Sequence, residues 1–122
     1  MPFPYTKVPF STLVGKLIVE IERKGDKELV FHTTDGIYKM FHEQDCCEDV
    51  HIEDICGDLN DLLNRRVTQA VESTSNDLCN ENHESATWTF YLISSDKGSV
   101  NIRWYGASNG YYSERADLWH YT

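Results

Sequence analysis

The stretch that decides the fold is residues 17–42, LIVEIERKGDKELVFHTTDGIYKMFH. Apolar and polar residues alternate over about 16–22, 28–33 and 36–43, which is the period of a half-buried β-strand. Thr34-Asp35-Gly36 separates the second and third of these segments, and an Asp-Gly pair between two alternating runs favours a tight hairpin turn. The stretch therefore predicts an antiparallel sheet.

A similar order of elements recurs in the second half of the chain. Further strands are expected at 67–72, 88–93, 99–105 and within 111–121. A turn at Lys97-Gly98 corresponds to the one at Asp35-Gly36, which indicates an internal duplication with copies 10–56 and 59–122. Chance similarity between two ordinary hairpins is the alternative. We predict one domain over 1–122, with a polar loop at 73–85 lengthening the second copy.

Helical patterns are confined to two short segments. Residues 57–64 form the better candidate, because Asp58 can cap a helix on which Leu59, Leu62 and Leu63 share one face. A short helical turn is also expected at 10–15. The predicted fold class is therefore α+β, mostly antiparallel β-sheet with one or two short helices.

Charge and composition exclude several classes of partner. The formal net charge of −9 argues against a nucleic-acid backbone, and no apolar run approaches the roughly 18–20 residues of a membrane helix. The opening residues lack the pattern of a secretory signal, so we expect a cytoplasmic protein. The acidic surface favours solubility. Alternatively, it mimics nucleic-acid charge through its densest carboxylates, which are Asp45, Glu48, Asp49, Glu53, Asp54, Asp58 and Asp61.

The cysteine pattern predicts reduced thiols. Four cysteines occupy positions 46, 47, 56 and 79, without a C-x-x-C pair. Adjacent cysteines do not easily share one disulfide or one zinc tetrahedron. A metal or redox site combining Cys46 or Cys47 with His42 or His51 remains the alternative. We expect no bound metal and no cofactor.

The segment most suited to ligand binding is residues 103–115, RWYGASNGYYSER. It combines two arginines, two glycines, an asparagine, two serines and four aromatic residues. Glycine lets backbone N–H groups approach a phosphate, arginine grips it, and aromatic rings stack on a base. These properties indicate a nucleotide pocket. The candidate ligand-binding residues are Phe90, Arg103, Tyr105, Ser108, Asn109, Tyr111, Ser113 and Arg115.

An ordinary hairpin is the alternative interpretation of this segment, with Trp104, Tyr111 and Tyr112 as core or sheet residues. Alternation separates the two roles in the strand at 99–105. If Val100, Ile102 and Trp104 face the core, then Asn101, Arg103 and Tyr105 face outward and are available to a ligand.

Catalysis is not expected. Residues 106–110 spell G-x-S-x-G, but a nucleophile elbow needs a larger parallel sheet and a helix after the serine. The acidic residues between 48 and 54 have no nucleophile or metal pattern beside them. We therefore predict a binding protein and not an enzyme.

Several short motifs resemble those of a widespread family of small phage and prophage proteins. They are QDCCE at 44–48, IEDI at 52–55 with Gly57-Asp58, TWTFY at 87–91, and IRWYG at 102–106 with SNGYYSE at 108–114. Among characterised phage proteins, the chain looks most like the first Thoeris anti-defence family. That resemblance implies a protein that sequesters cyclic ADP-ribose signals made by bacterial immune TIR enzymes.

We thus expect a phage anti-defence protein that binds and sequesters a small cyclic nucleotide signal of the cyclic ADP-ribose type without cleaving it, in the host cytoplasm. A homo-oligomer is expected, because a two-fold axis would bury exposed aromatic residues and complete a pocket from two chains. The alternatives are an acidic inhibitor of a host defence complex, such as an anti-CRISPR or DNA mimic, and a structural phage protein.

Overall fold

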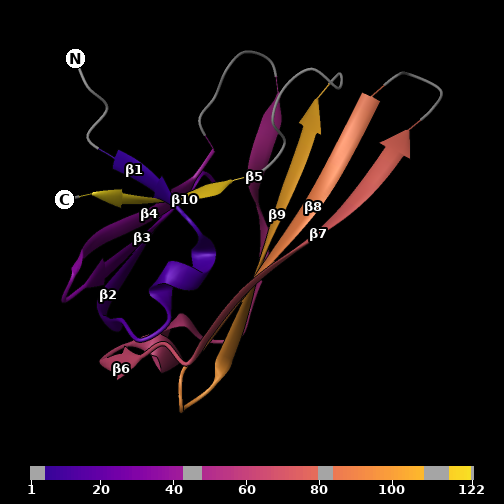
Figure 1. Cartoon of the computed structure of the whole chain (residues 1–122). Helices are drawn as coiled ribbons and strands as arrows, with labels where there is room; N and C mark the ends of the chain where they lie inside the picture. Colours follow the sequence, from indigo (N-terminus) through magenta and orange to yellow (C-terminus); the bar gives the residue numbers. More distant parts are fainter. Residues whose placement is uncertain (1–4, 43–47, 80–83, 109–115, 122) are drawn as a thin grey trace.

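Two antiparallel sheets face each other across one hydrophobic core (Figure 1). The computed structural model describes residues 5–42, 48–79, 84–108 and 116–121. The larger sheet contains β1 (Tyr5–Val8), β10 (Asp117–Tyr121), β4 (Gly36–Phe41), β3 (Glu28–Thr33), β2 (Leu17–Lys24) and β6 (Arg65–Arg66), in that order. The four-stranded sheet has the order β5 (Asp49–Cys56), β9 (Ser99–Ser108), β8 (Glu84–Ser94) and β7 (Gln69–Cys79).

Each half of the chain contributes a meander to one sheet and a single strand to the other. β2, β3 and β4 pair in succession, and the next strand, β5, pairs with β9 in the four-stranded sheet. β7, β8 and β9 also pair in succession, and β10 then pairs with β4. This exchanged arrangement is what a duplication followed by mutual strand exchange would leave, and the duplication itself stays a prediction.

The expectation of an α+β fold was wrong, because the described residues form a nearly all-β structure without an α-helix. Only two single-turn 3-10 helices occur in them, η1 (Phe10–Leu13) and η2 (Leu59–Leu62). Asp58 caps η2 as predicted, accepting a hydrogen bond of 2.9 Å from the backbone N–H of Asn60. The turn stops because Leu63 is extended and Asn64 has a φ of 59°. A single turn gains too little from its own hydrogen bonds to continue.

The expected loop at 73–85 is also replaced by strands. β7 continues to Cys79 and β8 begins at Glu84, and the two pair without a register shift from Gln69 opposite Ser94 to Cys79 opposite Glu84. The polar composition of 73–79 suggested a turn-rich segment. Ladder pairing with β8 overrides this weak propensity, because strand preference depends mainly on the neighbouring strand.

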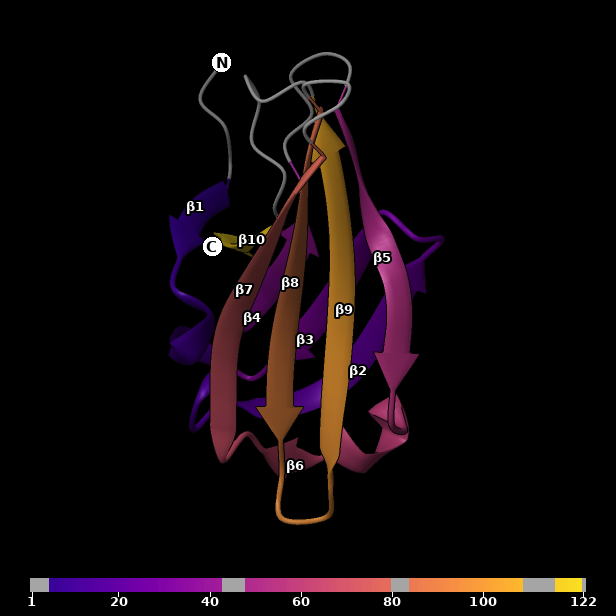
Figure 2. The ribbon, with the colours of Figure 1, turned by 90° about the vertical axis from the view of Figure 1, so that its right-hand side faces the viewer.

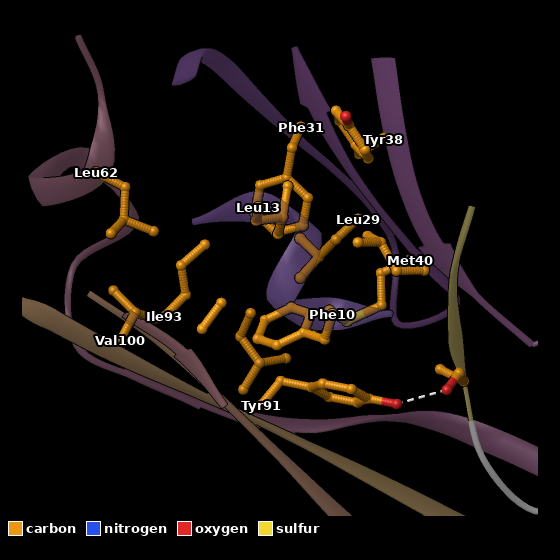
Figure 3. Packing of buried hydrophobic residues seen from close by; sticks show 14 of the residues in the cluster. Phe10, Leu13, Leu29, Phe31, Tyr38, Met40, Leu62, Tyr91, Ile93 and Val100 are labelled. Carbon is orange, nitrogen blue, oxygen red and sulfur yellow. Dashed lines mark hydrogen bonds between the residues drawn. The ribbon is translucent and has the colours of Figure 1, made fainter. Parts of the chain in front are cut away.

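The strands expected from alternation are otherwise present, including the Asp35-Gly36 hairpin, where Thr33 lies opposite Gly36. The core contains residues of both sheets and of both 3-10 turns (Figure 3). The Trp104 indole N–H donates to the Met40 sulfur across the sheets. The Tyr91 hydroxyl donates to the carbonyl oxygen of Ala116, shown as a dashed line in Figure 3. Among the described residues, no helix has the length and apolar character needed to span a bilayer.

Candidate ligand-binding face

Buried and outward side chains alternate along β9, as the sequence predicted. The fully buried side chains are Val100, Ile102 and Trp104. Those on the opposite face are the exposed Asn101 and the half-buried Arg103 and Tyr105. The outward side chains of β9 therefore belong to the outer face of the four-stranded sheet.

The neighbouring strand β8 contributes aromatic residues to the same outer face. Tyr91 and Ile93 point into the core, so Trp88, Phe90 and Leu92 lie on the other side of the strand. Figure 2 looks onto this face of β7, β8, β9 and β5, and none of the described elements covers it. We name as the aromatic face the four outward residues Trp88, Phe90, Arg103 and Tyr105.

Cross-strand pairing brings the members of the aromatic face together. Trp88 lies opposite Tyr105, with ring centroids 4.7 Å apart and planes inclined by 60°. Phe90 lies opposite Arg103, and the Arg103 guanidinium carbon is 5.4 Å from the centroid of the Trp88 ring. On the far side of Tyr105, the imidazole of His51 in β5 lies 5.6 Å away, centroid to centroid. A cation thus sits among three aromatic rings.

Two carboxylates of β5 contact the guanidinium. Arg103 Nη2 is 3.2 Å from Glu53 Oε1 and 3.9 Å from Asp54 Oδ2. A β-bulge between Ile52 and Asp54 lets these consecutive residues approach one side chain. The Arg103 Nε atom is shielded from solvent and has no hydrogen-bond partner. The guanidinium therefore retains a donor that no described acceptor satisfies.

The rim of this face holds two groups with shifted pKa values. The hydrogen bond from His51 Nδ1, 3.1 Å from Asp49 Oδ1, lowers the pKa of the Asp49 carboxyl, and Lys27 adds to this effect. The Cys56 thiol donates to Asp54 Oδ2 at 3.4 Å. That hydrogen bond to a carboxylate stabilises the protonated thiol and raises the pKa of Cys56 above its ordinary value. The exposed thiol is thus a weak nucleophile.

The structure brings some of the predicted ligand-binding residues together. Phe90, Arg103 and Tyr105 share the aromatic face. Ser108 ends β9, so residues 106–108 are strand and not a nucleophile elbow. The remaining predicted residues, Asn109, Tyr111, Ser113 and Arg115, lie outside the described residues.

Sequence reasoning missed three neighbours of Arg103. Trp88 could have been found, because it lies two residues before Phe90 and so faces the same way. Glu53 and Asp54 had been considered only as members of an acidic run. Their contact with Arg103 spans about fifty residues and a bulge, and no local pattern signals it.

The acidic residues proposed to mimic nucleic acid are largely engaged within the protein. Glu48 is buried and lies 3.0 Å from His42 Nε2, and Asp61 lies 3.7 Å from Lys97 Nζ. A charge mimic needs exposed carboxylates in a row, and a buried Glu48 does not fit one. Of the alternative metal site, His42 and His51 contact carboxylates, while Cys46 and Cys47 lie outside the described residues.

Two other features of the described residues offer chemistry. Glu20, Glu22 and His32 on the outer surface of the larger sheet bring one potential metal-ligating atom each within 4.8 Å of one another. A separate groove of about 450 Å³ opens where β1, η1, β7 and β10 meet. Its lining residues are Lys7, Val8, Pro9, Phe10, Ser11, Ala70, Glu72, Asp117 and Leu118.

Comparison with known proteins identifies a family but no activity. No curated protein and no solved structure matches the chain. A family model described as a domain of unknown function, DUF7448, matches residues 11–118, which include every strand from β2 to β9. Because that match covers most of the chain, the protein belongs to the DUF7448 family.

Proposed function

We propose that the protein is a non-enzymatic binding protein whose aromatic face holds a small nucleotide, such as a cyclic nucleotide signal of the cyclic ADP-ribose type. The observation that carries the proposal is a guanidinium 5.4 Å from the Trp88 centroid, beside Tyr105, on an uncovered sheet face. An aromatic ring offers a stacking surface to a base, and a guanidinium offers donors to a phosphate.

The carboxylates beside Arg103 fit this ligand class as well. Glu53 Oε1 and Asp54 Oδ2 lie beside the guanidinium, and carboxylates accept hydrogen bonds from ribose hydroxyls in many nucleotide sites. Base, phosphate and ribose would thus each meet a matching group. None of these groups forms a nucleophile with an adjacent base, which supports binding without cleavage.

The ion pairs of Arg103 do not prevent phosphate binding. The side chains of Arg103 and Glu53 are 40% and 35% exposed, and an exposed pair of this kind is worth about 0.2–1 kcal/mol. A charge-assisted hydrogen bond to phosphate contributes about 1.5–3 kcal/mol. A phosphate can therefore displace or share the guanidinium at a small net cost, although the net charge of −9 opposes its approach.

The same magnitudes bound the affinity. One stacked base adds about 1–3 kcal/mol, and one phosphate contact about 1.5–3 kcal/mol. Their sum, about 2.5–6 kcal/mol, corresponds to a Kd between roughly 10 mM and 50 µM. A titration followed by NMR suits this range better than a pull-down.

The test is a titration of cyclic ADP-ribose, ADP-ribose, NAD and cyclic AMP into the labelled protein. We expect shifts at the amides of β8 and β9 and a Kd at least tenfold weaker for Arg103→Ala, because a contact worth about 1.5–3 kcal/mol is lost. Arg23→Ala is the matched control, since it removes one exposed arginine from the larger sheet. Binding that Arg103→Ala and Trp88→Ala leave unchanged would move the site elsewhere.

A protein-binding inhibitor is the second candidate, and one observation favours it. Val71 is 45% exposed and lies opposite Leu92 on the same outer face, so an apolar strip borders the aromatic face. Trp, Tyr and Arg are also the residues that dominate protein interfaces. Shifts spread over this strip with a protein partner, and none with nucleotides, would favour this candidate. The phage anti-defence role, the cytoplasmic location and the homo-oligomer remain predictions.

A further inference from the structure

We propose that the open edge of β7 is a docking site for an extended, basic segment of another protein, which adds to the four-stranded sheet as a fifth strand. This inference is independent of nucleotide binding at the aromatic face. It rests on a comparison of the sheet edges, on the groove beside β7 and on the charge around it.

Three of the four sheet edges carry features that discourage strand addition. β1 is four residues long, contains Lys7 and is followed by Pro9. β6 has only two residues. β5 is interrupted by the bulge between Ile52 and Asp54 and is rich in carboxylates. Short length, lysine, proline, bulges and charges are the usual protections of an edge strand.

β7 has none of the structural protections. It runs for eleven residues, keeps a regular register with β8 throughout, and contains no proline, lysine or arginine. It pairs with no other described strand, and Figure 2 shows it at the edge of the four-stranded sheet. A long, regular edge with unguarded backbone groups is the geometry used in strand addition.

A groove continues from this edge and adds side-chain specificity. Ala70 and Glu72 of β7 line one wall, and the buried Phe10 and Leu118 line others. A strand advances about 3.3 Å per residue, so a segment paired with 73–79 reaches the groove within its next two residues. The groove would then receive an apolar side chain of that segment.

Charge selects the chemistry of the segment and argues against a second copy of this chain. The eleven residues of β7 include two acids and no base, and Asp117 adds a carboxylate to the groove, where Lys7 Nζ lies 3.4 Å from it. Two copies that each carry a charge of −9 repel one another. A segment with lysine or arginine is complementary to this edge.

The test uses the full chain and an acetylated, amidated peptide of four lysine-valine repeats. We expect this peptide to slow hydrogen exchange at least about tenfold at alternate amides within 73–79, because those amides become strand donors. The amides of β5 serve as the internal reference. A lysine-glycine peptide of equal charge should bind at least about tenfold more weakly, since it has low strand propensity and no side chain for the groove.

Matched charge reversals give a second readout. Glu72→Lys should weaken the lysine-valine peptide at least about tenfold, whereas Glu20→Lys, on the exposed surface of the larger sheet, should change affinity by less than about twofold. Circular dichroism checks that both variants fold, and Glu72→Gln replaces Glu72→Lys if that variant does not. Arg103→Ala should leave peptide binding unchanged, which separates this proposal from the nucleotide proposal.

Three results would overturn the inference. Equal binding of the two peptides would mean charge attraction alone. Protection in β5 or β1 without protection in β7 would place the docking edge elsewhere. Protection of β7 that rises with protein concentration without peptide, together with a doubled mass in light scattering, would identify a second copy as the occupant.

Discussion

Replacing Gly57 by alanine should destabilise the fold more than any comparable change at an open glycine. Gly57 directly follows β5 and has a φ of +115°. A Cβ atom there would lie 2.7 Å from the carbonyl oxygen of Ser99 and 3.2 Å from the Cα of Val100. Both are backbone atoms at the start of β9, so neither can yield without shifting the β5–β9 pair that holds Arg103 against its carboxylates.

The expected loss combines two contributions. The unfavourable φ costs about 1–3 kcal/mol for a residue with a side chain, and the backbone overlap adds about 1–3 kcal/mol. Gly57→Ala should therefore lose about 2–6 kcal/mol of the free energy of unfolding. Gly15→Ala is the control, because Gly15 has a φ of +87° but no atom within 4 Å of the added Cβ, so only the first contribution applies.

Urea denaturation followed by circular dichroism measures both variants. We expect a lower midpoint at an unchanged m value, with Gly57→Ala less stable than Gly15→Ala by about 1–3 kcal/mol. Equal losses in the two variants would refute the claim that the backbone of β9 excludes a side chain at position 57.

Two further predictions concern single hydrogen bonds. Because the contact with Asp54 raises the pKa of Cys56, iodoacetamide at pH 8 should alkylate Cys56 more slowly than a cysteine in an unstructured peptide, and Asp54→Asn should speed this reaction severalfold. Peptide-level mass spectrometry would show this, and equal rates in both proteins would contradict it. Tyr91→Phe should cost about 1–3 kcal/mol of unfolding free energy, because the buried carbonyl of Ala116 loses a donor. Tyr121→Phe, at an exposed position, should change stability by less than about 0.5 kcal/mol in the same denaturation assay.

Local periodicity predicted the parts of the fold that depend on neighbouring residues. Alternation placed Arg103 and Tyr105 on the face opposite Trp104, because a strand turns successive side chains to opposite sides. The Asp35-Gly36 turn was readable for the same reason, since hairpin turns have specific residue requirements.

Features set by distant pairing could not be read in this way. The exchange of β5 and β10 between the sheets depends on partners far away in the sequence. The polar run at 73–79 resembles a loop until β8 is placed beside it. The predicted helix at 57–64 shortened to a 3-10 turn, because Leu62 is buried in the core while Leu63 already follows an extended path.

The central claim is that the aromatic face binds a nucleotide through Arg103, and one titration tests it most directly. The amide shifts of the ¹⁵N-labelled protein would be followed as cyclic ADP-ribose is added up to about 10 mM, for the natural chain and for Arg103→Ala and Arg23→Ala. The proposal predicts saturating shifts centred on β8 and β9, a Kd weakened at least about tenfold by Arg103→Ala, and no change with Arg23→Ala. Absence of shifts at these strands, or equal affinity in all three proteins, would contradict it.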